Sequence, residues 1–117
     1  MAEPIDPGTR ARYLETLSEY GCSEFVVFNP RSQGWILEEF GCHPKLVAKA
    51  MYVHVAEGGE IKKIRENGDP SIYQNEYHYD LVFKFSRFLL YSETLFIESR
   101  RSGDRIEVVS VKYHEKN

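Results

Sequence analysis

The hydrophobic periodicity of the chain changes once, at Gly58-Gly59, and this change constrains the fold more than any other feature. Before the glycine pair, apolar residues recur at intervals of three and four, the spacing of one helical face. After it, apolar and polar residues alternate, as they do in half-buried strands. A chain of 117 residues has the usual size of one domain. The sequence therefore predicts a single α+β domain, with a helical half at about 6–58 and a sheet half at about 60–114.

The helical half repeats one pattern three times, in which a capping residue and a proline precede each helix. The pairs are Asp6-Pro7, Asn29-Pro30 and His43-Pro44. The side chain of a capping residue accepts from amides of the first turn, and proline at the first helical position gives up an amide that has no partner. Glycine then follows each pattern, at Gly21, Gly41 and Gly58. The sequence predicts two to three helices packed on one face of the sheet.

The sheet half predicts a mainly antiparallel sheet of about four strands. The predicted strands are 60–65, 77–85, 95–99 and 105–114, with a charged edge strand first and a three-stranded meander last. Turn residues at 67–70 and 102–104 separate them. The apolar run 25–28 is ambiguous in type and could pair as a further edge strand.

Alternation divides these strands into two faces. We expect the odd-numbered residues to lie under the helices and the even-numbered ones to form an open polar face. The even set includes His78, Asp80, Lys84, Glu98, Arg100, Ser110, Lys112 and His114, interrupted by Phe96, Ile106 and Val108. The tyrosines Tyr73, Tyr77 and Tyr79 suit either base stacking on RNA or the core under the helices.

Composition excludes several classes of protein. The longest apolar runs fall far below the roughly 20 residues of a membrane-spanning helix, and the acidic, proline-containing start is unlike a signal peptide. We therefore expect a cytoplasmic protein without membrane contact. The spacing of Cys22 and Cys42 matches no zinc or redox motif, and no cofactor or metal motif is present, so neither cofactor nor metal is expected.

Chemistry is predicted on the polar sheet face, where His78 and His114 lie near cationic residues. RNA cleavage needs a proton acceptor for the 2′-OH, cations for the developing phosphorane charge and a proton donor for the leaving oxygen. Lys84 and Arg100 could supply the charge, and Tyr113 or His114 the proton. The alternative is a solvated surface of salt bridges that involves Asp80, Glu98 and Glu107.

The order of elements from Val26 to His114 carries a resemblance. A short strand, a helix ending in Phe40-Gly41-Cys42, a second helix and a sheet whose last strand is Ile106 to His114 follow one another. This arrangement resembles the RelE/ParE-like toxin superfamily. The resemblance implies a small toxin that cleaves mRNA without a metal, on the ribosome in some members, and that a partner antitoxin neutralises. It also implies roles for Lys84, Arg100, Tyr113 and His114, which occupy the places of the basic residues and the C-terminal Tyr or His of such toxins.

Two other functions remain open. A non-catalytic interaction module, such as an immunity protein, an inhibitor or a phage-derived regulator, could bind a basic protein partner through the acidic helical half. Its acidic residues are Glu3, Glu15, Glu19, Glu24, Glu38 and Glu39. A small-ligand pocket lined by aromatic residues between the helices and the sheet is the third candidate. The sequence leaves the oligomeric state undetermined.

Overall fold

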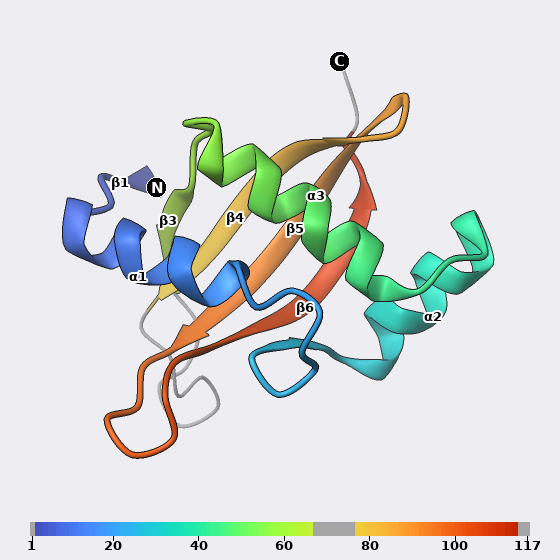
Figure 1. Cartoon of the computed structure of the whole chain (residues 1–117). Coiled ribbons are helices and arrows are strands. Elements are labelled where there is room, and N and C mark those ends of the chain that lie inside the picture. The colour runs from blue at the N-terminus through green and yellow to red at the C-terminus, as the bar shows by residue number, and fades with distance from the viewer. Residues whose placement is uncertain (1, 67–76, 115–117) are drawn as a thin grey trace.

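A computed structural model describes residues 2–66 and 77–114 of the chain (Figure 1). Within these residues, three helices are α1 (Pro7–Leu17), α2 (Pro30–Phe40) and α3 (Pro44–Ala56). The strands are β1 (Ala2–Glu3), β2 (Val26–Phe28), β3 (Lys62–Arg65), β4 (Tyr77–Phe85), β5 (Phe88–Ile97) and β6 (Arg105–Tyr113). The predicted turn at 67–70 and Tyr73 lie outside the described residues.

The predicted α+β class is confirmed, with the helices first and a mainly antiparallel sheet second. The described strands form one sheet in the order β1-β3-β4-β5-β6-β2, so it has six strands rather than about four. The three helices lie on the same side of this sheet (Figure 1). None of the described helices has the length and apolar composition that crossing a membrane requires.

The predicted caps begin the helices. Asp6 accepts from the amide of Thr9, Asn29 from that of Ser32, and His43 Nδ1 from that of Lys45. These are bonds that satisfy amides of the first turn.

Two helices end where glycine was expected and one does not. Gly41 ends α2 in the left-handed conformation, at φ 62°. The first helix, however, ends at Leu17 and not at Gly21, which corrects the prediction. The Ser18 hydroxyl donates to the carbonyl of Glu15, which gives that group a partner outside the regular helical ladder.

The register between β4 and β5 corrects the predicted faces. Tyr79 is paired with Thr94 and Asp80 with Glu93. Residues opposite each other in an antiparallel pair share a face, so odd-numbered residues of β4 lie with even-numbered residues of β5. The predicted parity is therefore right for β4 and wrong for β5. Phe96 does not interrupt the open face, because its ring packs edge-on against buried Tyr13 of α1, with 5.4 Å between centroids.

An irregularity changes the parity again in β6. Glu93 is paired with Ser110 and Thr94 with Val108, so the register between the two strands shifts by one residue between these pairs. A bulge of this kind adds one residue to one strand and reverses its alternation. Ile106 and Val108 are buried on the helix side, which corrects their placement on the open face. The bounds of the strand predicted at 95–99 are also corrected, because β5 runs from Phe88 to Ile97 and the prediction covers only its end.

The edges of the sheet differ from the prediction at one side. The charged strand β3 is covered by β1, which pairs with it antiparallel, so β3 is not an edge. The ambiguous run at 25–28 does form an edge strand, β2, and it lies parallel to β6. Its neighbour α2 packs on the sheet through aromatic contacts of Trp35 and Phe40 with Tyr113.

A buried chain of hydrogen bonds joins α1 to the centre of the sheet. Thr94 donates to the carbonyl of Tyr79 at 2.7 Å, and Tyr13 Oη lies 2.7 Å from Thr94 Oγ1. Because threonine has one hydroxyl proton, the Tyr13 hydroxyl must be the donor to Thr94. Both side chains are fully buried, and burial raises the pKa of Tyr13. The phenol therefore remains a donor at neutral pH.

This chain of hydrogen bonds predicts coupled effects on stability. Tyr13→Phe removes one buried hydrogen bond and should lower the free energy of unfolding by about 1 kcal/mol. Thr94→Val leaves the buried Tyr13 hydroxyl without its acceptor and should lower the free energy of unfolding by about 1–3 kcal/mol. We expect the double variant to lose less free energy of unfolding than the sum of the two single losses, because it leaves no buried hydroxyl without a partner. Urea unfolding of the four proteins measures the coupling, and strictly additive losses would contradict it.

Candidate functional site

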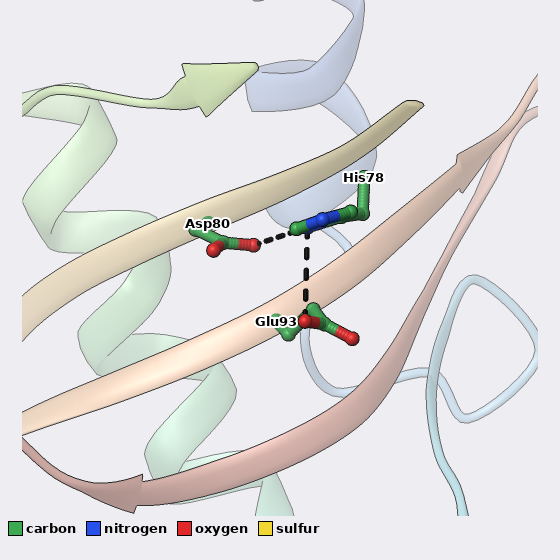
Figure 2. A group of neighbouring side chains, drawn as sticks. All are labelled: His78, Asp80 and Glu93. Atoms are coloured by element: carbon green, nitrogen blue, oxygen red, sulfur yellow. Dashed lines mark hydrogen bonds and ion pairs between the residues drawn. The ribbon is translucent and has the colours of Figure 1, made fainter. Parts of the chain in front are cut away.

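Three side chains meet on the open face of the sheet, opposite the helices. His78 and Asp80 come from β4 and Glu93 from β5, where it is the direct partner of Asp80 in the register. His78 Nδ1 lies 2.8 Å from Asp80 Oδ1 and 3.7 Å from Glu93 Oε1. Figure 2 shows the imidazole turned toward both carboxylates. We call these three residues the open-face cluster.

Asp80 is the buried member of the open-face cluster. Its side chain is 1% exposed, against 14% for His78 and 40% for Glu93. A buried carboxylate is costly unless hydrogen-bond donors replace its water. The Tyr91 hydroxyl donates to Asp80 Oδ2, while Asp80 Oδ1 faces His78. Tyr91 therefore holds the Asp80 carboxylate in place, and this carboxylate in turn orients the imidazole of His78.

The other nitrogen of His78 faces a third carboxylate. Glu66, the residue after β3, places its Oε2 3.9 Å from His78 Nε2. The imidazole thus has an acidic neighbour at each nitrogen, which fixes the plane of the ring.

A hollow of about 390 Å³ lies beside the cluster on the same face. Its lining residues are Tyr91, Glu93, Ser110, Lys112, Tyr113 and His114. The His114 ring stacks on Tyr91, with 6.5 Å between centroids and 11° between planes. Lys112 Nζ lies 5.5 Å from the centre of the Tyr91 ring. Glu93 therefore belongs both to the cluster and to a hollow that carries a lysine and a second histidine.

Tyr91 connects the hollow with the buried aspartate. Burial, followed by the hydrogen bond to Asp80 and the charge of that carboxylate, raises the pKa of Tyr91. The phenol therefore remains protonated at neutral pH and acts as a donor to Asp80 and not as a proton source.

The structure separates the residues predicted to carry chemistry. His78 lies in the open-face cluster and His114 in the hollow. Lys84 is exposed and lies opposite Leu89, whose carbonyl accepts from the His114 amide. His78, His114 and Lys84 share the open face, while Arg100 lies elsewhere. Tyr113 contributes to the lining of the hollow, but its ring faces the helices.

Arg100 and Tyr113 are placed away from the cluster. Arg100 follows the far end of β5, and the eight residue steps from Leu89 to Ile97 span roughly 26 Å of strand between it and Lys84. Tyr113 faces the helices, where its ring packs on Trp35 at 5.1 Å between centroids. Burial and a hydrogen bond with Glu39 raise the pKa of Tyr113.

The sequence interpretation missed Tyr91, Glu93 and Lys112 as site residues. Glu93 and Tyr91 lie in β5, in a part of the chain where no strand was predicted. The missed signal is the alternation Leu90-Ser92-Thr94 against Tyr91-Glu93-Leu95, which becomes visible once 88–97 is treated as one strand. Tyr77 and Tyr79, the candidates for base stacking, lie on the helix side, and Tyr79 is buried there.

Comparison with protein-family models, with curated proteins and with solved structures finds no match for this chain. The resemblance to RelE-like toxins therefore stays a prediction, and the site must be judged by its geometry.

The raised pKa of Tyr91 predicts a loss of stability in alkali. An unfolded tyrosine loses its proton near pH 10, whereas the folded protein retains the Tyr91 proton to higher pH. Above about pH 10 the unfolded state thus binds fewer protons, and the free energy of unfolding falls as pH rises. We expect Tyr91→Phe to be less stable at pH 7 and to lose stability less steeply above pH 10. Urea unfolding from pH 7 to 11 tests this, and parallel curves would contradict it.

Proposed function

We propose that this chain is a RelE-like toxin or toxin-derived domain that cleaves RNA on the open face of its sheet. One observation carries the proposal: Glu93 and His78, a carboxylate and an imidazole, lie 3.7 Å apart at the edge of a hollow that also contains Lys112 and His114. A base, an acid and a cation in one place are the groups that cleavage of an RNA phosphodiester requires.

The proposed mechanism gives each group one task. The Glu93 carboxylate, which is 40% exposed, takes the proton of the ribose 2′-OH. The 2′-oxygen then attacks phosphorus, while protonated His78 gives its proton to the leaving 5′-oxygen. Lys112 neutralises charge on the phosphorane. The bond from phosphorus to the 5′-oxygen breaks, and the products are a 2′,3′-cyclic phosphate and a free 5′-hydroxyl.

The neighbouring residues support this assignment. Asp80 and Glu66 hold the imidazole of His78, one at each nitrogen. An acid that is held in one orientation loses less conformational entropy when it reaches the reactive geometry. His114 and Lys84 lie further along the face, where they suit contacts with the flanking phosphates of a single strand.

The acidic net charge of −3 is compatible with RNA binding only through local cations. Phosphate contacts depend on the lysines that reach the strand and not on the charge of the whole chain. Lys112 and Lys84 are both exposed. Access of RNA to the hollow is therefore expected to depend on salt concentration.

Removing the base or the acid should abolish cleavage. We expect Glu93→Gln and His78→Gln each to lower the cleavage rate of purified protein on single-stranded RNA by ~10²–10⁴-fold in chelator-treated buffer. The matched controls are Glu107→Gln, a carboxylate of β6 opposite Leu95, and His43→Gln at the start of α3. The cleaved ends should carry a cyclic phosphate, and full activity in Glu93→Gln would exclude this site.

Induced expression in a bacterium extends the test to the cell. The proposal expects growth arrest and mRNA cleavage from the unchanged chain, and neither from Glu93→Gln. A Lys84→Ala/Arg100→Ala double variant tests the residues implied by the RelE-like resemblance separately. Loss of activity there, with retention in Glu93→Gln, would place cleavage at those residues instead.

The second candidate is a non-catalytic protein-interaction module. It is favoured by the exposure of acidic residues along the helical half, Glu15, Glu19, Glu24, Glu38 and Glu39. Apolar side chains are exposed there as well, among them Leu37 at 65%. Normal growth with intact transcripts after expression of the unchanged chain would favour this module over the toxin.

A further inference from the structure

We propose that the open-face cluster, His78, Asp80 and Glu93, binds one divalent transition-metal ion, with Zn²⁺ as the ion it suits best. Each residue offers one ligand atom, and the three atoms lie within 4.8 Å of one another. Figure 2 shows the three side chains converging from two adjacent strands. Antiparallel strands are rigid supports, so the ligands are held together without help from a loop.

The distances suit a shared ion after a small adjustment. Zinc lies about 2.0–2.2 Å from nitrogen and oxygen ligands, so two ligands of one tetrahedral ion are roughly 3.4 Å apart. The distances from His78 Nδ1 to Asp80 Oδ1 and to Glu93 Oε1 are 2.8 and 3.7 Å, on either side of this value. Glu93 is the most exposed of the three residues, and rotation of its side chain can provide the adjustment.

Residues outside the ligand set provide an independent argument for a metal. Ligating histidines almost always donate their second ring N–H to a carboxylate, a carbonyl or water, which fixes the tautomer. Glu66 places its Oε2 3.9 Å from His78 Nε2 and leaves Nδ1 to face the cluster. The Tyr91 hydroxyl occupies Asp80 Oδ2, so Oδ1 is the oxygen that faces the ion. The Glu66 contact and the Tyr91 hydrogen bond thus leave His78 Nδ1 and Asp80 Oδ1 facing one point.

The ligand set selects the class of ion. Mg²⁺ and Ca²⁺ prefer sites made wholly of oxygen, whereas one imidazole with two carboxylates suits Zn²⁺ and its neighbours in the first transition row. Three protein ligands leave a fourth position for water or another group. We therefore expect Zn²⁺ and Co²⁺ to bind and Mg²⁺ to compete poorly.

An ion at this position would also regulate the proposed function, a consequence that rests on that function. The ion takes the Glu93 carboxylate that accepts the 2′-OH proton and the Nδ1 lone pair of His78. Zn²⁺ would therefore inhibit RNA cleavage, and a chelator would restore it.

The test is direct metal binding, which needs no activity. A Cys22→Ser/Cys42→Ser form, stripped with a chelator, is titrated with Zn²⁺ by calorimetry and with Co²⁺ by visible absorption. We expect one ion per chain and Co²⁺ bands without thiolate charge transfer. Glu93→Gln and His78→Gln should weaken binding at least 100-fold, and Glu66→Gln and Tyr91→Phe by ~10–100-fold. Glu107→Gln and His43→Gln, the controls, should bind as the unchanged chain does.

The outcomes separate the site from its consequence. Residue 93 is half-exposed, so Glu93→Gln should fold normally, and circular dichroism checks this. An unchanged Zn²⁺ affinity in this variant would overturn the site. Equal affinity for Mg²⁺ and Zn²⁺ would overturn the choice of ion. Specific Zn²⁺ binding by a chain that cleaves no RNA would support the site and count against the proposed function. Cleavage that continues at saturating Zn²⁺ would overturn the regulation.

Discussion

The pairing of β4 with β5 is the constraint on which both faces of the protein depend. One register places Tyr79 opposite Thr94 on the helix side and, one residue further, Asp80 opposite Glu93 on the open side. The first pair joins the Tyr13 hydroxyl to the sheet and holds α1 in place. The second brings two carboxylates together at the edge of the hollow. A slip of one residue would exchange the faces and destroy both arrangements.

Burying Asp80 requires compensation, because taking a carboxylate out of water costs several kcal/mol before its partners are counted. Its described partners are His78 and Tyr91, one for each oxygen. Neither bond helps to form the sheet, which the backbone ladder already builds. A surface built for stability alone could place an apolar residue there at less cost. The buried aspartate is thus better explained by what it does to His78 than by what it adds to the fold.

The helices could be predicted from the sequence because their signals are local. Asp6, Asn29 and His43 cap the first turns by bonds to residues two or three positions away, so a short window contains the whole interaction. The strands depended on partners far along the chain. Residues 88–97 lack a turn signal inside them, and the change of parity in β6 arises from an irregularity next to Glu93. Alternation within one strand cannot show which of its faces meets which face of the next.

The site was predictable to the same extent as the strands that carry it. His78 and His114 were identified from single residues, because a histidine on a polar face is informative alone. The combination of His78 with Glu93 required the register, since the two residues are fifteen positions apart in the sequence and belong to different strands. Arg100 was grouped with Lys84 by parity, a criterion that ignores the length of β5 between them. Parity assigns a face, and only register assigns a position on it.

The two proposals for the open-face cluster place different demands on Glu93. As a base it must reach a ribose hydroxyl outside the cluster, and as a ligand it must turn inward toward Asp80 and His78. Its 40% exposure makes both positions accessible, whereas Asp80 has one position in either state. Buried Asp80 therefore keeps one position, and half-exposed Glu93 can turn either to the ion or to the RNA. Ion and RNA then compete for a single carboxylate, so the concentration of free metal would decide which state the site occupies.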